Sequence, residues 1–233
     1  MPRVRAIQFA LAGLLAALGA GLIAFNVELF EVGGAKPQSG TPPKQVKFDY
    51  YVFALSWSPG FCIEEADERN GPECGPKAHF GFVVRGLWPQ KERGFPIDCD
   101  PETGRVPQSL ARDLRDIMPL AGFVGHQWRA HGACSGLSMD EYFALTRRAY
   151  DRLTIPENFR APKAARAVSA GEVRGEFIAV NPGLAGSMIR IVCSEKLFRE
   201  VRVCMTKDLA FRACGDDVRD QCAPARVSVL PVP

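Results

Sequence analysis

The sequence has little histidine and little net charge for a chain of its length. Only three of its 233 residues are histidine, and the formal net charge is +3. Proteins that coat nucleic acid without sequence preference carry a much stronger basic excess. Any contact with nucleic acid is therefore expected in one local cleft rather than over a whole face of the molecule.

The eight cysteines contain no Cys-x-x-Cys pair and no Cys/His cluster at zinc spacing, so their pattern argues against a metal site. An even set of cysteines is instead typical of a disulfide framework in an exported protein. Eight cysteines allow about 105 pairings, so the spacing alone leaves the connectivity open. We expect disulfides, no metal and no cofactor.

The N-terminus has the pattern of an export segment. Arg3 and Arg5 precede an uncharged run over residues 6–27. Signal peptides and N-terminal membrane anchors share this pattern of charge followed by an apolar run. Residues 1–35 are therefore interpreted as either a cleaved signal peptide or a retained anchor. Both alternatives place the rest of the chain outside the cytoplasm, in the periplasm or secreted.

Residues 36–45 are rich in glycine, proline, serine and lysine, which predicts a flexible linker before one domain over residues 46–233. In that domain, aromatic and β-branched runs predict strands, and capping boxes at Ser138 and Ser169 predict helix starts. Strands interleaved with segregated helices indicate an α+β fold, in which helices pack on an antiparallel sheet. Strands are expected at residues 48–57, 80–87, 188–193 and 197–205, and helices at 108–118, 126–132, 139–153 and 170–180.

Two short segments hold two of the three tryptophans and two of the three histidines. Residues 82–89 read FVVRGLWP, and residues 126–134 read HQWRAHGAC. With residues 55–62 (LSWSPGFC), they resemble, in type and in order, three motifs of the RNase T2 family of secreted, metal-independent endoribonucleases with an α+β fold. The resemblance spans about residues 46–222, and three ordered motifs of this length argue against chance similarity.

The resemblance implies that RNA is cleaved by attack of the ribose 2'-hydroxyl on the adjacent phosphorus, which gives a 2',3'-cyclic phosphate. It implies that His131 is one of two rings that transfer protons, that His126 contacts phosphate, and that Trp88 stacks a base. The cysteine layout of the family further implies the disulfides Cys62–Cys74, Cys99–Cys134, Cys193–Cys222 and Cys204–Cys214.

Three positions depart from the family's pattern: Arg85 replaces the first catalytic histidine, Gln127 a glutamate and Ala130 a lysine. A guanidinium with a pKa above about 12 stays protonated, so Arg85 cannot act as a base, but its fork can bind a phosphate of the substrate. Gln127 keeps a hydrogen-bonding amide, whereas Ala130 offers nothing to a phosphate. His126 is then the remaining candidate for the base, with His131 as the second catalytic ring.

The spacing of the two histidines limits how they can share a site. Five residues apart, His126 and His131 diverge by about 140° on an ideal helix, so we expect both to line one cleft only near a frayed helix start. His79 would lie about 20 Å from Arg85 along an extended strand and is interpreted as a surface or core residue. Trp57 and Trp128 are expected in the core.

The sequence is compatible with two functions. The first is a monomeric, extracytoplasmic endoribonuclease that is weakened by the lost histidine and acts through His126, His131, Gln127 and Arg85. The second is a catalytically silent protein of the same fold that binds RNA, a nucleotide or phosphate. The retained histidines favour the first, and the three departures favour the second.

Overall fold

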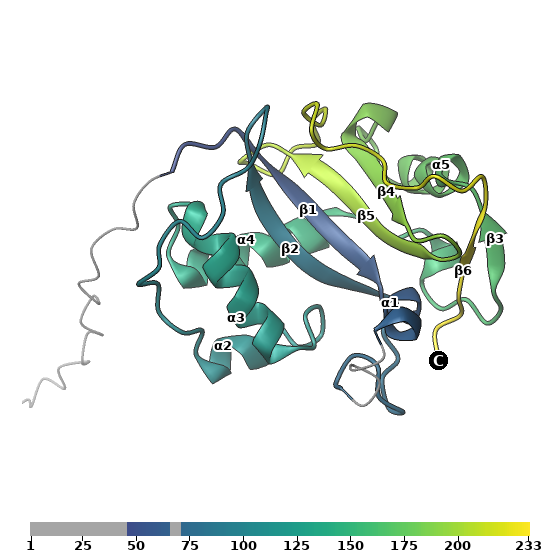
Figure 1. Ribbon diagram of the computed structural model, residues 1–233, viewed down its shortest axis with the longest axis horizontal. Coiled ribbons are helices and arrows are strands. Elements are labelled where there is room, and N and C mark those ends of the chain that lie inside the picture. Colours follow the sequence, from purple (N-terminus) through teal and green to yellow (C-terminus); the bar gives the residue numbers. More distant parts are fainter. Residues whose placement is uncertain (1–45, 66–70) are drawn as a thin grey trace, which may run out of the picture. The chain divides into compact units, whose positions relative to one another are not determined.

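The computed structural model describes residues 46–65 and 71–233 (Figure 1). The export segment and the linker predicted for residues 1–45 lie outside the described residues. Within the described part of the chain, no helix is long and apolar enough to span a membrane.

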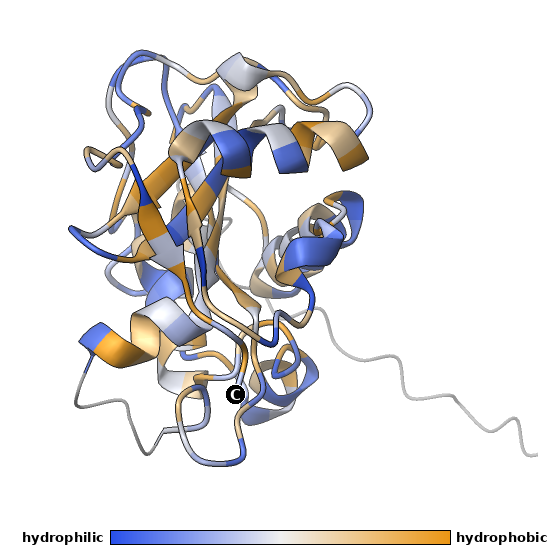
Figure 2. Cartoon of the chain, turned by 90° about the vertical axis from the view of Figure 1, so that its right-hand side faces the viewer, coloured by the Kyte–Doolittle hydropathy of each residue, from blue (hydrophilic) through white to orange (hydrophobic). Residues whose placement is uncertain are grey.

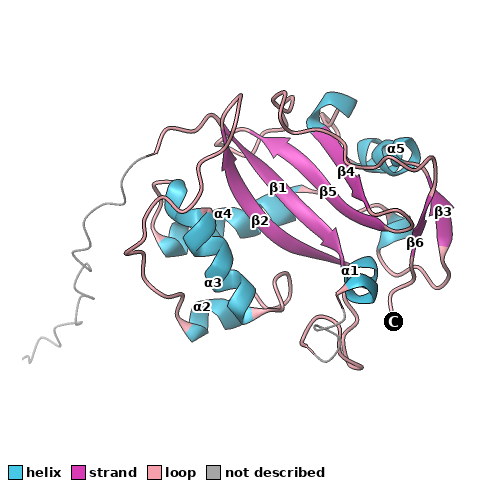
Figure 3. Ribbon diagram, viewed as in Figure 1, coloured by secondary structure: helices cyan, strands magenta, loops and turns pink. Residues whose placement is uncertain are grey.

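A four-stranded antiparallel sheet with the strand order β2-β1-β5-β4 forms the centre of the domain (Figure 3). A separate antiparallel pair, β3 and β6, completes the strands described. The α+β fold with an antiparallel sheet, predicted from the sequence, is confirmed. The strands are β1 (Tyr50–Trp57), β2 (Phe82–Gln90), β3 (Arg166–Val168), β4 (Ile189–Cys193), β5 (Phe198–Met205) and β6 (Val227–Val229).

Helices pack against both edge strands of the sheet: α4 contacts β2, and α5 contacts β4 (Figure 1). The α-helices are α1 (Ser58–Glu64), α2 (Gln108–Asp113), α3 (Ala121–Ala130), α4 (Met139–Arg152) and α5 (Ala170–Val180). Short 3-10 turns are η2 (Gly132–Cys134), η3 (Glu157–Phe159) and η4 (Gly186–Met188).

Both predicted capping boxes form. Ser138 Oγ accepts the backbone N–H of Glu141 at 3.3 Å, while the Glu141 carboxylate accepts the backbone N–H of Ser138 at 2.9 Å. Ser169 and Glu172 make the same reciprocal pair at the start of α5. Each box satisfies two backbone donors that the first helical turn leaves without an intrahelical partner, which fixes where the two helices begin.

The structure differs from the predicted elements around prolines. A turn was expected at Pro59, but α1 begins there, because a proline in the first helical turn loses no hydrogen bond. Strand β2 continues through Pro89, where the sequence predicted its end. Since β2 is an edge strand of the sheet, the missing N–H of Pro89 breaks no ladder.

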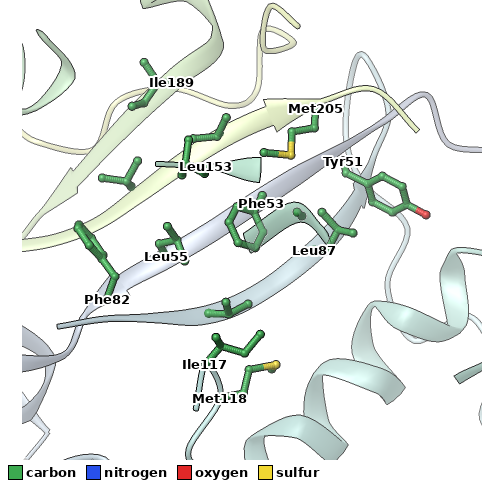
Figure 4. Packing of buried hydrophobic residues seen from close by; sticks show 14 of the residues in the cluster. Tyr51, Phe53, Leu55, Phe82, Leu87, Ile117, Met118, Leu153, Ile189 and Met205 are labelled. Atoms are coloured by element: carbon green, nitrogen blue, oxygen red, sulfur yellow. The ribbon is translucent and has the colours of Figure 1, made fainter. Parts of the chain in front are cut away.

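All eight residues of β1 are buried, so both faces of the sheet are covered at this strand. Alternate residues of β1, from Tyr51 to Trp57, join the main hydrophobic core. Figure 4 shows Tyr51, Phe53 and Leu55 within it. Tyr50 and Val52 point to the opposite face, where they join a smaller cluster with Cys204 and Val218. Hydrophobic residues dominate the central strands, and hydrophilic residues gather on the outer helices and loops (Figure 2).

Four disulfides staple the domain, and together they use all eight cysteines. Two of them tie segments beside the motifs in the sequence: one joins α1 to the segment before β2, and another joins η2 to the loop after β2. The bonds are Cys62–Cys74, Cys99–Cys134, Cys193–Cys222 and Cys204–Cys214, the pairing that the resemblance implies.

Candidate functional site

Of the side chains singled out in the sequence, Arg85 and Trp88 of β2 lie on the face of the sheet opposite the main core. On β2, Val84 and Leu87 belong to the main core. Arg85 instead lines a cavity together with Ser56 of β1, which is on the opposite face. Gly86 has a φ of +152°, and a Cβ at this position would collide with Gln127 Oε1 and Trp88 Nε1. Glycine is therefore needed for β2 to pass beneath these two side chains.

Arg85 is held by a carboxylate that the sequence did not point to. Its Nη2 donates to Glu73 Oε1 at 2.8 Å, and its Nη1 donates to Glu73 Oε2 at 3.2 Å. Ser58 Oγ donates to Glu73 Oε1 at 3.0 Å. Arg85 is only 8% exposed and Glu73 only 2%. The fork expected from the sequence to bind phosphate is thus occupied by Glu73 in this structure.

Aromatic rings enclose the guanidinium of Arg85 further. Its Cζ lies 4.0 Å from the ring centroid of Phe61 and 5.1 Å from that of Phe123. Such contacts attract a cation to the ring faces, and they are stronger where water is excluded. The ion pair and the two rings together hold this side chain in one place in the lining of the cavity.

Helix α3 supplies the second motif. Gln127 is 3% exposed, and its Oε1 accepts the indole N–H of Trp88 at 2.8 Å. Gln127 thus orients Trp88 rather than offering its oxygen to the cavity. Ala130, at the position where the resemblance has lysine, is 2% exposed, and its carbonyl accepts the backbone N–H of Asp98 at 3.0 Å.

His131 lies just beyond the end of α3, where the backbone leaves the helical path (φ −129°, ψ −46°). The expectation of a frayed helix start is wrong, because α3 begins at Ala121 and His126 lies within the helix. The end of the helix, rather than its start, allows the two histidines to approach one cleft. Since His131 is outside the helix, the angle of about 140° between ideal helical positions no longer separates it from His126.

The imidazole of His131 is half-buried, and its Nδ1 makes no hydrogen bond within the described residues. Desolvation, aided by the charge of His126, lowers the pKa of His131 from 6.5 to about 4. The Asp98 carboxylate opposes this shift. His131 is therefore a neutral ring at neutral pH, able to accept a proton.

Ring contacts link these groups in two short chains. The centroids of Trp88 and His131 lie 5.5 Å apart. The ring centroid of Phe123 lies 6.1 Å from that of the exposed His126 and 5.1 Å from Cζ of Arg85. In the described part of the chain, no hydrogen bond joins Arg85 to either histidine. His126 acts on His131 electrostatically, whereas Arg85 is linked to His126 through the ring of Phe123.

Two hollows lie along this face. One, of about 800 Å³, is lined by Arg85, Phe61, Phe123 and Glu200, among others. The other, of about 530 Å³, is lined by Trp88, His131, Phe95 and Arg202, among others. A hydrogen bond of 2.5 Å from Arg202 Nε to Glu200 Oε1 connects the linings of the two hollows.

The remaining histidine and tryptophans lie apart from this site. His79 is exposed, and its Nδ1 lies 2.7 Å from the carbonyl oxygen of Pro233. Trp57 and Trp128 are both in the main hydrophobic core, as predicted. Over the ranges that the structure describes, no group of three or more His, Cys, Asp or Glu side chains is placed to hold a metal ion.

Three residues of the site were missed in the sequence: Glu73, Asp98 and Arg202. Glu73 and Asp98 each precede a half-cystine, and a disulfide brings each of them to the site from outside the motifs. Arg202 lies in a run of alternating polar and apolar residues that predicted a half-buried strand. The alternation in that run was the available signal, because it predicts a strand with one polar face. It does not predict which groups that face contacts.

Known proteins of one family match this chain. The Ribonuclease T2 family model matches residues 48–214. A ribonuclease of Aeromonas hydrophila is 31% identical over 77% of this chain and 82% of its own length. A probable ribonuclease of Haemophilus influenzae is 29% identical, over 68% of this chain and 62% of that protein.

Solved structures give the same result for the fold. Trichomaglin, described as an S-like ribonuclease, superposes with a TM-score of 0.60 at 20% identity, over 80% of this chain and 100% of that one. The RNase-related protein from Calystegia sepium gives a TM-score of 0.58 at 20% identity, over 81% and 98%. From its sequence, its fold and its disulfides, this chain belongs to the Ribonuclease T2 family.

Proposed function

We propose that this protein is a slow endoribonuclease that acts outside the cytoplasm and cleaves RNA by transphosphorylation, without a metal. Membership of the Ribonuclease T2 family supports the substrate class. RNase NT with 5'-AMP and an RNase MC1 mutant with 5'-UMP, both of this fold, are complexes with nucleotides. The four disulfides, and the export pattern of residues 1–35, support an extracytoplasmic location.

The position of His131 is the observation that carries the proposal: its half-buried imidazole lies 5.5 Å from the Trp88 ring and lines the hollow of about 530 Å³. In the reaction, the ribose 2'-oxygen bonds to phosphorus, the bond from phosphorus to the 5'-oxygen breaks, and a proton moves at each oxygen. A half-buried imidazole whose pKa is lowered to about 4 is unprotonated near neutral pH and so is available to accept the 2'-hydroxyl proton, while its low basicity is a further reason for slow cleavage. Since Nδ1 is buried, Nε2 is the nitrogen that accepts this proton.

The roles expected from the sequence are thereby exchanged. His126, expected as the base, is then assigned to protonate the leaving 5'-oxygen, because His131 takes the role of the base. Trp88, oriented by Gln127 and next to His131, stacks a base of the RNA in the hollow of about 530 Å³.

Low turnover follows from the charges of the site. The guanidinium of Arg85 faces Glu73, so this pair presents little net charge to a phosphate. Ala130 has no charge to replace it. Loss of a group that transfers protons typically costs about 10² to 10⁴ in rate, and loss of charge stabilisation costs a similar factor.

The test is an assay of the purified full-length protein on RNA in the presence of EDTA, with the products examined for 2',3'-cyclic phosphate ends. We expect slow, EDTA-resistant cleavage that falls at least about 10²-fold in His131→Ala. His79→Ala is the matched control and retains the wild-type rate. Equal rates for wild type and His131→Ala would reject the proposed mechanism and point to a contaminating nuclease.

The second candidate is a catalytically silent protein that binds RNA or a nucleotide, and the closed Arg85–Glu73 pair favours it. The triple variant Arg85→His, Gln127→Glu, Ala130→Lys separates the two candidates, as does the same variant with Glu73→Gln. If wild type is inert and either variant cleaves RNA, the silent protein is the correct description. The variant that includes Glu73→Gln is needed because the Glu73 carboxylate would favour the protonated form of a histidine introduced at position 85. A protonated histidine could not act as the base.

A further inference from the structure

Arg202 of β5 occupies the centre of the face that carries the site. In the register of the sheet, Arg202 is opposite Ala54, and Ala54 is opposite Gly86 on its other side. Residues directly opposite each other in antiparallel strands point to the same face. The row from Arg202 to Gly86 therefore crosses three strands with no side chain larger than a methyl group between its ends.

The guanidinium of Arg202 lies beside the groups to which the chemistry is assigned. Its Cζ is 5.4 Å from the ring centroid of Trp88, whose ring is in turn 5.5 Å from that of His131. Arg202 and His131 also line the same hollow of about 530 Å³. A ligand in that hollow meets the imidazole of His131, the indole of Trp88 and the guanidinium of Arg202, and the carboxylate of Asp217 also belongs to the lining.

Arg202 and Arg85 differ in what their terminal nitrogens do. Both Nη atoms of Arg85 donate to Glu73, and its side chain is 9% exposed. Arg202 instead uses Nε to donate to Glu200 Oε1, and its side chain is 22% exposed. Among the residues that the structure describes, neither Nη of Arg202 donates a hydrogen bond.

We propose that Arg202 is the phosphate-binding residue of this cleft, with its Nη1 and Nη2 donating to the nonbridging oxygens of a phosphodiester or phosphate monoester. This assignment rests on the proposed function and deepens it. Guanidinium groups bind phosphate through two parallel N–H donors, and Glu200 fixes the group by its third nitrogen without occupying those donors. Arg202 thus offers N–H donors that Ala130 cannot supply and that Glu73 occupies at Arg85, while Glu200 offsets part of its charge.

The experiment compares the affinities of 5'-AMP and adenosine by calorimetry at fixed, low salt, using the full-length protein. The ratio of the two dissociation constants isolates the contribution of the phosphate. For wild type we expect 5'-AMP to bind at least about tenfold more tightly than adenosine, as for charge-assisted hydrogen bonds. In Arg202→Gln the ratio falls close to one, while adenosine binding changes little.

Three further variants serve as controls. Arg212→Gln is the matched control, because Arg212 has contacts like those of Arg202. Its Cζ lies 4.2 Å from the ring centroid of Tyr50, and its Nη2 donates to Glu92 Oε1 at 2.8 Å. Arg212 lines neither hollow of the site. This variant retains the wild-type ratio. Arg202→Gln combined with Glu200→Gln removes the carboxylate that the single variant leaves facing the phosphate. Glu200→Gln alone keeps or raises the ratio, since it removes a negative charge.

The outcomes are decisive in both directions. A ratio near one in the double variant, with wild-type ratios in Arg212→Gln and equal or higher ratios in Glu200→Gln, supports the assignment. A phosphate preference that persists in the double variant overturns it, and so does a wild-type ratio of one. The cleavage assay is separate: an inert wild type that shows the Arg202-dependent ratio rejects the ribonuclease and leaves the phosphate site standing.

Discussion

Glu73 Oε1 lies 2.8 Å from Arg85 Nη2 in a pair whose side chains are 1% and 9% exposed. Glu73 directly precedes Cys74, and the Cys62–Cys74 disulfide ties its segment to α1. The positive charge of Arg85 is thus paired with the negative charge of Glu73, which comes from a separate segment of the chain. Arg85 and Glu73 act as one unit, and the effect of replacing either depends on the other.

The pair should contribute to stability in a way that a double-mutant cycle detects. Arg85→Met is expected to lower the free energy of unfolding by at least about 2 kcal/mol, because two charge-assisted hydrogen bonds between buried groups are lost. Adding Glu73→Met should cost less than the sum of the two single changes. The measurement is urea unfolding with the disulfides intact.

Arg147→Met is the control for this cycle. Arg147 pairs with Asp116 at 2.5 Å, but the two side chains are 29% and 64% exposed, so loss of the pair should cost less than about 1 kcal/mol. Equal small effects at positions 85 and 147, with additive energies in the cycle, would show that Arg85 and Glu73 are not energetically coupled.

Much of the fold follows from local sequence because the relevant interactions are local. The capping boxes at Ser138 and Ser169 use atoms within three residues of one another, so their sequence pattern is sufficient. Strands β3 and β6 were missed because each has only three residues and their pairing joins residues about 60 positions apart. Short pairings of this kind leave no periodic pattern in the sequence.

The site was predicted where the motifs contain it and missed where distant segments complete it. The sequence marks Arg85, His126 and His131, but Glu73 enters the site through a disulfide and Arg202 through strand register. Neither relation is visible in residue spacing. The prediction that the Arg85 guanidinium binds phosphate therefore could not take account of Glu73, because only the tertiary structure shows that the two side chains pair.

The lowered pKa of His131 should make stability depend on pH. The folded-state pKa is about 4, compared with 6.5 for an ordinary histidine, so between these values the unfolded chain binds more protons. The free energy of unfolding should therefore fall as the pH drops from about 6.5 toward 4, by an upper limit of about 3 kcal/mol at 1.36 kcal/mol per unit. His131→Gln should flatten this part of the profile.

The comparison is best made between about pH 5 and 6.5, where ordinary carboxylates remain ionised. His79→Gln serves as the control, because His79 is exposed and lines neither hollow of the site. Parallel profiles for wild type and His131→Gln in this window would show that His131 titrates alike in the folded and unfolded chains.

Asp98 should set how readily His131 takes a proton. Its backbone N–H donates to Ala130 O at 3.0 Å, the neighbouring Cys99 is bonded to Cys134, and its φ of +49° is one that Asp and Asn tolerate. Asp98→Asn therefore keeps the backbone and removes the charge. We expect the pKa of His131 to fall further, measured by NMR titration of its ring protons.

Asp100→Asn is the matched control for Asp98, because Asp100 lies in the same loop but is not among the charges that act on His131. It should leave the titration of His131 unchanged. If both changes, or neither, move that titration, the carboxylate of Asp98 has no specific effect on the ring.

The orientation of Trp88 should depend on one buried amide. Gln127 Oε1 accepts the Trp88 indole N–H at 2.8 Å, so Gln127→Leu removes the acceptor and should cost about 1 to 3 kcal/mol of unfolding free energy. The indole N–H resonance of Trp88 should shift upfield as its hydrogen bond is lost.

The indole of Trp57, which donates to Leu230 O at 3.1 Å, gives an unchanged reference signal in the same spectrum. Gln127→Glu retains an acceptor and should preserve the Trp88 resonance, so an equal shift in both variants would mean that Gln127 does not orient this ring through its oxygen.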